Sequence, residues 1–100
     1  MKMRLSFLAA AALTALAGPA AARCSQPYAP VVKITASATK EDVESLRADV
    51  AAFIAASDVY QTCLIAARDR TRISANQLQK ERIVGEFNNA LRSFKASRSS

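Results

Sequence analysis

Apolar and small residues recur along the middle of the chain at alternating steps of three and four, beginning at Val43. This spacing keeps them on one side of an α-helix, as in a coiled-coil seam. Thr39 is placed to cap such a helix, and acidic residues follow in the first turn, where the helix dipole favours negative charge. The pattern predicts a helix over residues 40–70 with this seam: Val43, Leu46, Val50, Phe53, Ser57, Tyr60, Leu64 and Ala67.

A second helical pattern follows the polar stretch RDRTRISANQ, residues 68–77. Ser74 with Gln77 three positions later is a capping-box pattern, which predicts a helix over residues 75–95. A short connection favours antiparallel neighbours, so the expected fold is an all-α, antiparallel two-helix hairpin over residues 39–96. Because no Gly or Pro marks the turn, one continuous bent helix remains an alternative. The predicted apolar side of the second helix holds Ile73, Ile83, Val84, Phe87, Leu91 and Phe94.

The segments on either side of the hairpin have a different character. Pro27 and Pro30 fix φ and keep their predecessors out of the helical region, so residues 23–38 are expected to form an extended arm. Residues 97–100 are polar and are expected to form a disordered tail.

Residues 1–22 are typical of a signal peptide. Lys2 and Arg4 precede an apolar run, and small residues then end at Ala22, so cleavage near Ala22 would deliver the chain to the periplasm or outside the cell. An uncleaved signal anchor is one alternative, although the apolar run is shorter than the ~20 residues that span a bilayer. A lipoprotein acylated at Cys24 is another, although Arg23 stands where a small residue is needed.

The two cysteines, Cys24 and Cys63, are expected to pair as a structural disulfide, because an exported chain of this size needs a staple. Helix between Thr39 and Cys63 spans about 36 Å, and an extended arm spans about 46 Å. The bridge therefore requires an arm that runs antiparallel along the first helix. Catalytic dithiols usually form Cys-x-x-Cys, so a redox pair is the weaker alternative. Tyr28, Val31, Val32 and Ile34 are expected to cover a small-residue face made of Ala48, Ala52, Ala55, Ala56, Val59 and Ala66.

The composition argues against an enzyme. The chain has no histidine, and its cysteines are expected to be oxidised, so neither a Cys/His zinc site nor a nucleophile–histidine pair can form. The acidic residues are explained as dipole partners or solvated side chains, and no glycine-rich phosphate loop is present. We therefore expect no catalytic residues, no metal site and no cofactor. Gly85 is the one glycine after residue 22. It is either a substitution that the helix tolerates without a structural role, or a place where another backbone, such as that of a homodimer partner, comes close.

Positive charge is concentrated in the second half of the chain. The full chain carries +6, and loss of Lys2 and Arg4 would leave +4. Solvated surface explains much of this excess, and attraction to anionic lipid or an acidic partner is the functional alternative. Nucleic acid is not expected, because no aromatic platform accompanies the arginines. The possible anion or partner contacts are Arg68, Arg70 and Arg72 in the turn, and Arg92 and Lys95 near the end.

One frame in the sequence resembles a known group. It consists of C-P-P spacing before the first helix, then D-x-Y-x-x-C-L, carried here by Cys24, Pro27, Pro30, Asp58, Tyr60, Cys63 and Leu64. A closing FN..LR.F at Phe87–Phe94 completes it. This frame resembles small, uncharacterised secreted helical proteins of proteobacteria. The resemblance implies a periplasmic location and brings no known activity with it.

The expected function is that of a non-enzymatic periplasmic helical binding or assembly module, whose partner is another protein or a second copy. The alternative is an envelope-surface protein that binds anionic lipid or lipopolysaccharide through its basic turn and C-terminus.

Overall fold

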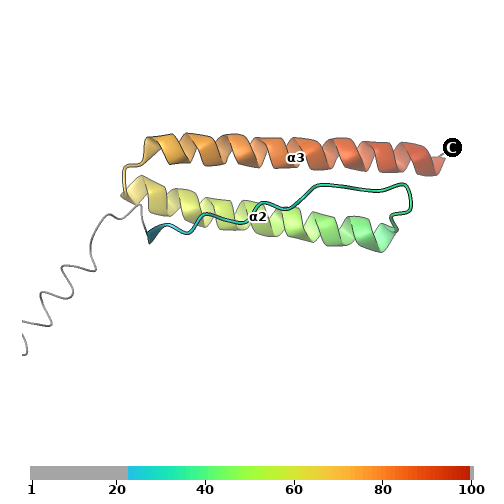
Figure 1. Ribbon diagram of the computed structural model, residues 1–100, viewed down its shortest axis with the longest axis horizontal. Coiled ribbons are helices and arrows are strands. Elements are labelled where there is room, and N and C mark those ends of the chain that lie inside the picture. The colour runs from blue at the N-terminus through green and yellow to red at the C-terminus, as the bar shows by residue number, and fades with distance from the viewer. Residues whose placement is uncertain (1–22, 100) are drawn as a thin grey trace, which may run out of the picture.

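The computed structural model describes residues 23–99, so the predicted signal peptide lies outside the described residues. Two helices, α2 (Lys40–Ala66) and α3 (Arg70–Ser99), lie antiparallel and pack against each other (Figure 1). No strand occurs between residues 23 and 99, which confirms the predicted all-α hairpin. We call the turn between the helices the closed end, and the opposite end, where α2 begins and α3 finishes, the open end.

The seam of α2 is the one that its spacing predicts. Seven of the eight predicted positions, from Val43 to Leu64, are buried, and Ala67 at the turn is half-buried. The helix begins with a complete capping box, in which Thr39 accepts a hydrogen bond from the Asp42 amide while Asp42 accepts one from the Thr39 amide. These paired bonds satisfy two amides that would otherwise lack partners at a helix start.

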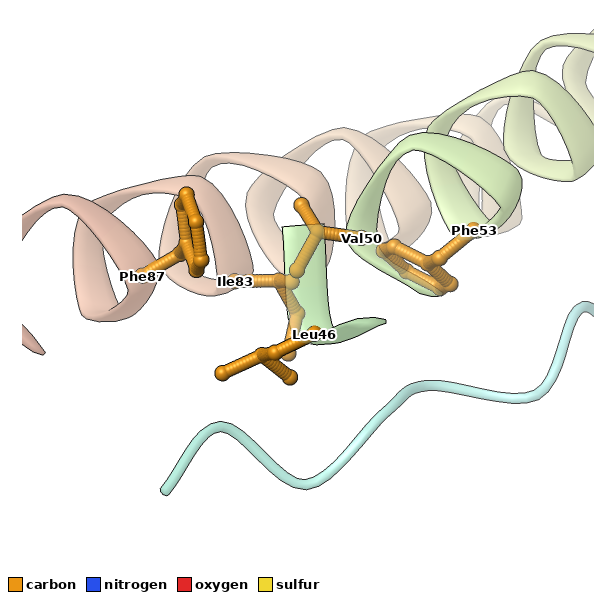
Figure 2. Packing of buried hydrophobic residues seen from close by; sticks show 5 residues of the cluster. All are labelled: Leu46, Val50, Phe53, Ile83 and Phe87. Atoms are coloured by element: carbon orange, nitrogen blue, oxygen red, sulfur yellow. The ribbon is translucent and has the colours of Figure 1, made fainter. Parts of the chain in front are cut away.

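The core of the hairpin forms where α2 meets α3 at mid-length. Ile83 and Phe87 of α3 contact residues of α2 there, and Figure 2 shows their side chains converging in one cluster. Val84 was predicted on this apolar side, but it is 38% exposed. The residues of α3 that face α2 are Ile83 and Phe87, and this leaves Val84 at the edge of the packed surface. The buried cluster consists of Leu46, Val50, Phe53, Ile83 and Phe87.

The seam also contains one buried polar layer. Asn76 of α3 is 3% exposed and donates a hydrogen bond of 3.2 Å to the hydroxyl of Ser57, which is fully buried. Gln61 donates to the side-chain oxygen of Asn76 at 2.8 Å. Nearby, the Lys80 ammonium lies 2.7 Å from the Asp58 carboxylate and ties the same stretch of the two helices together. A polar layer of this kind fixes the register of paired helices at some expense of stability.

The turn lies earlier than predicted. Ala67 caps α2, and Arg68 has a φ of 58°, the left-handed conformation that a Schellman motif requires. The Asp69 amide bonds to the Leu64 carbonyl and the Arg68 amide to the Ile65 carbonyl, which completes that motif. The chain is therefore interrupted here, and the alternative of one continuous bent helix is wrong.

The second helix also begins earlier and ends later than predicted. Asp69 caps α3 by accepting a hydrogen bond from the Arg72 amide at 3.1 Å, so the restart predicted near Ala75 is wrong. At the other end α3 continues to Ser99, so residues 97–99 are helical and not part of a disordered tail. Arg98 supports this last turn, because its guanidinium lies 5.0 Å from the ring centroid of Phe94 and its charge suits a helix C-terminus.

The arm runs antiparallel along α2, as predicted, and reverses in a turn at residues 35–38 before the helix starts (Figure 1). The disulfide holds its beginning to α2. Along its length, Ala29, Val32 and Ile34 pack against the buried cluster. Tyr28 and Val31 lie beside Ala52 and Ala56 but do not cover the small-residue face as predicted, because their side chains are 93% and 82% exposed.

The physical reason lies in the extended backbone, whose side chains alternate between two sides. The arm turns Val32 and Ile34 inward to the seam between the helices, and this places Val31 and Lys33 outward. The small-residue face of α2 therefore stays largely exposed, and the arm only borders it at Ala52 and Ala56. The exposed residues of this face are Ala48, Ala52, Ala55, Ala56, Val59 and Ala66.

Candidate functional site

A groove at the open end is the strongest candidate site. It has a volume of about 480 Å³ and lies between the first two turns of α2 and the last two turns of α3. Its position follows from the antiparallel packing, which brings the start of one helix against the end of the other. The lining residues are Lys40, Val43, Glu44, Arg47, Leu91, Phe94, Lys95 and Arg98.

The floor of the groove is apolar. Val43 is 3% exposed and belongs to the seam of α2. Leu91 and Phe94 are half-buried, and Leu91 also packs against the buried cluster. The hydrophobic core therefore continues to the open end of the hairpin and meets solvent there.

The rim of the groove is cationic. Lys40 and Arg47 come from α2, Lys95 and Arg98 come from α3, and the one acid in the lining is Glu44. Arg47 pairs with Glu44 at 3.4 Å, but both side chains are at least half exposed, so solvent weakens the pair. Four positive charges against one negative charge give the groove a net attraction for anions.

Two of these cations are held over aromatic rings. The Arg47 guanidinium lies 5.3 Å from the ring centroid of Phe87, and Arg98 covers Phe94. Such contacts restrict the side chains and occupy only the face of each guanidinium. One edge of Arg47 contacts Glu44, and its other N–H groups point away from that pair. The groove thus combines an apolar floor with charged groups whose positions are partly fixed.

The predicted cations of the turn lie elsewhere. Arg68 and Arg70 flank Ile65 and Ile73 at the closed end, in a concavity of about 480 Å³. Arg72 pairs with Asp69 at 3.4 Å. These three arginines are separated from the open end by almost the full length of α3, so the structure does not bring the predicted cations into one site.

Of the predicted cations near the C-terminus, Lys95 lines the groove, whereas Arg92 does not. Arg92 donates a hydrogen bond to the side chain of Asn89 on the exposed side of α3. The sequence prediction missed Lys40, Arg47 and Arg98. An antiparallel alignment of residues 40–47 with residues 91–98 could have located them, because the hairpin itself was expected.

A larger concavity lies near the disulfide, with a volume of about 620 Å³. Its two cations, Arg72 and Arg82, are paired with Asp69 and Glu86. Each of its two cations thus has an adjacent acid, so its local charge is balanced, whereas the open-end groove has four cations and one acid.

The predicted disulfide is confirmed. Cys24 and Cys63 are bonded with their Cα atoms 5.6 Å apart, and no free cysteine remains among residues 23–99. This bond is consistent with an oxidising compartment. Within the same residues, no group of three or more acidic, histidine or cysteine side chains is placed to hold a metal ion.

Gly85 is not explained by a close approach within the described chain. A Cβ atom built at this position would meet no atom within 4 Å. The backbone of α3 is open at this position, and alanine would fit.

Helix α2 is long and apolar enough to cross a membrane by length and composition alone. This is weak evidence, because core helices of soluble proteins satisfy the same criterion. In the hairpin the seam of α2 from Val43 to Leu64 is buried and Asp58 bonds to Lys80, while Val59 and Ile65 stay exposed.

No protein-family model matches the chain, and neither a curated protein nor a solved structure matches it. Fold and site together define a disulfide-bonded helical hairpin with an anion-attracting apolar groove at its open end.

Proposed function

We propose that the protein is a non-enzymatic binding module of the cell envelope, and that its binding surface for anionic partners is the open-end groove. The observation that carries the proposal is the apolar floor at Val43, Leu91 and Phe94 beneath a rim with four cations and one acid. Membrane surfaces rich in anionic lipid present the complementary charge. The envelope location is supported by the signal-like residues 1–22 and by the disulfide, with export to the periplasm or beyond after cleavage near Ala22.

Co-sedimentation with lipid vesicles tests this proposal. The purified protein, its N-terminus established by mass spectrometry, should bind phosphatidylglycerol-containing vesicles and not pure phosphatidylcholine, and binding should weaken as salt rises. Each cation near an anionic surface is worth about 1 kcal/mol. A Lys40→Gln/Arg98→Gln variant should therefore bind roughly thirtyfold more weakly.

The matched control is Arg68→Gln/Arg70→Gln, which removes the same charge from the closed end. Circular dichroism verifies that both variants remain helical. The proposal expects the control to bind nearly as well as the unmodified protein. Equal weakening of both variants would mean that overall charge, not the groove, drives binding, and the proposal would be wrong.

Self-assembly through α2 is a second candidate function, favoured by one observation. The uncovered face of α2 carries Ala48, Ala52, Ala55 and Val59 at alternating steps of four and three, and Val59 is 73% exposed. This spacing suits packing against a helix of a second copy. Sedimentation velocity at increasing concentration tests it: a dimer that Val59→Asp abolishes supports the candidate, and a monomer at all concentrations contradicts it.

A further inference from the structure

We infer that the occupant of the open-end groove is a single-chain amphiphile with a phosphate head. This inference rests on the proposed function and specifies its ligand. The groove offers an apolar floor that ends directly beneath a cationic rim, and a ligand that satisfies both must carry an apolar chain joined to an anion.

The size of the groove favours a small amphiphile over a protein. Eight residues line it, whereas a stable protein interface uses about 20–30 residues on each side. Its volume of about 480 Å³ falls within the range of about 300–1,000 Å³ that is typical of small-molecule sites. One alkyl chain with its head is therefore a better match than a docked helix.

The rim favours phosphate as the head. Arg47 and Arg98 present planar guanidinium groups, which bind phosphate oxygens in pairs, and each is positioned over a ring. Lys40 adds a further charge from the start of α2. Charges that surround one small site suit a head with up to two negative charges better than a single carboxylate.

The apolar floor of the groove determines how much of the ligand's alkyl chain can be buried. Val43 is buried at the base, and Phe94 forms a half-buried wall under Arg98. A chain that lies along these residues removes methylene groups from water, and each buried methylene increases affinity about fourfold. Because the floor is short, this increase must stop when the chain outgrows it.

Isothermal titration calorimetry with hexyl, octyl and decyl phosphate, each below its micelle concentration, tests the inference. We expect affinity to rise about fourfold for each added methylene that the floor covers and then to level off. Inorganic phosphate and decyl maltoside, which present the head or the chain alone, should each bind at least tenfold more weakly than decyl phosphate.

Three variants locate the effect. Phe94→Ala should flatten the dependence on chain length, whereas Ile73→Ala, which removes a half-buried apolar side chain at the closed end, should preserve it. Lys40→Gln/Arg98→Gln should weaken all alkyl phosphates by a similar factor. Thermal melts establish that each variant is folded under the titration conditions.

The failures are distinguishable. If either inorganic phosphate or decyl maltoside binds as tightly as decyl phosphate, the inference is overturned. The proposed binding to anionic vesicles is tested separately and does not fail with it. An undiminished chain-length dependence in Phe94→Ala would also overturn it. If neither vesicles nor alkyl phosphates bind, both the inference and the proposed function fail.

Discussion

Arg68 is the residue at which the backbone departs furthest from its ordinary preferences. Its φ of 58° is the left-handed conformation that costs a residue with a Cβ atom about 1–2 kcal/mol. Glycine usually occupies this position of a Schellman motif. Because glycine is absent here, the sequence pattern predicts the break between the helices a few residues too late.

Arg68→Gly is therefore expected to raise the free energy of unfolding by up to about 1 kcal/mol, because glycine adopts this conformation without a steric penalty. Urea denaturation measures the change. Arg92→Gly, which makes the same substitution inside α3, should instead lower stability by about 1 kcal/mol. A loss of stability in Arg68→Gly would contradict the Schellman turn.

Asn76 is a buried polar residue that the sequence analysis did not identify. It falls at the start of the predicted second helix but was not placed on the side that packs, whereas it lies in the seam and bonds to Ser57 and Gln61. Because Ser57 was predicted in the seam, the sequence could have been searched for a polar residue of the second helix that lies opposite it, and Asn76 is that residue.

Asn76→Ala is expected to lower the free energy of unfolding by about 2 kcal/mol, because it leaves the buried Ser57 hydroxyl without this partner. Asn88→Ala, at an exposed position of the same helix, should change it by less than about 0.5 kcal/mol. Equal effects in urea denaturation would show that the polar layer contributes nothing.

The two helices differ in how well the sequence predicts them. The seam of α2 was predictable because its large apolar residues keep strict spacing, which packing against α3 then uses. The start of α3 was not predictable, because the sequence contains two candidate N-caps. One is Ser74, with Gln77 three positions later, and the other is Asp69. Asp69 caps α3 because the Schellman turn ends α2 directly before it, and this depends on the conformation of Arg68.

Gly85→Ala is expected to stabilise α3 by about 1 kcal/mol, because glycine disfavours a helix interior and an added Cβ meets no atom within 4 Å. Thermal unfolding over a range of protein concentrations measures the effect. A clear loss of stability would show that another backbone approaches this position, as in the homodimer alternative.

The molecule as a whole depends on the arm being tied back to α2. The predicted disulfide and antiparallel course were correct because chain length leaves little choice: the arm must be extended to reach Cys63. Chain length does not predict which side of α2 the arm lies against, because this depends on which side chains of the arm point inward. The groove, by contrast, follows from the expected hairpin once residues 40–47 are aligned antiparallel with residues 91–98, which brings Lys40 and Arg47 to Lys95 and Arg98.

Cys24→Ser/Cys63→Ser is expected to lower the free energy of unfolding by about 4 kcal/mol, since the bond closes a loop across a separation of 39 residues. For a domain with a total stability of about 5 kcal/mol, most of the fold would be lost. Reductant should have the same effect on the unmodified protein. Unchanged melting in both cases would contradict a structural role for the bond.

The central claim is that ligand binding occurs at the open end of the hairpin. The most direct test is a two-dimensional NMR titration of the ¹⁵N-labelled protein with decyl phosphate, followed at the backbone amides. The account predicts that the largest shifts cluster at Val43, Leu91 and Phe94, with Ile65 and Ile73 unaffected. Shifts centred on the closed end, or spread evenly along both helices, would contradict it.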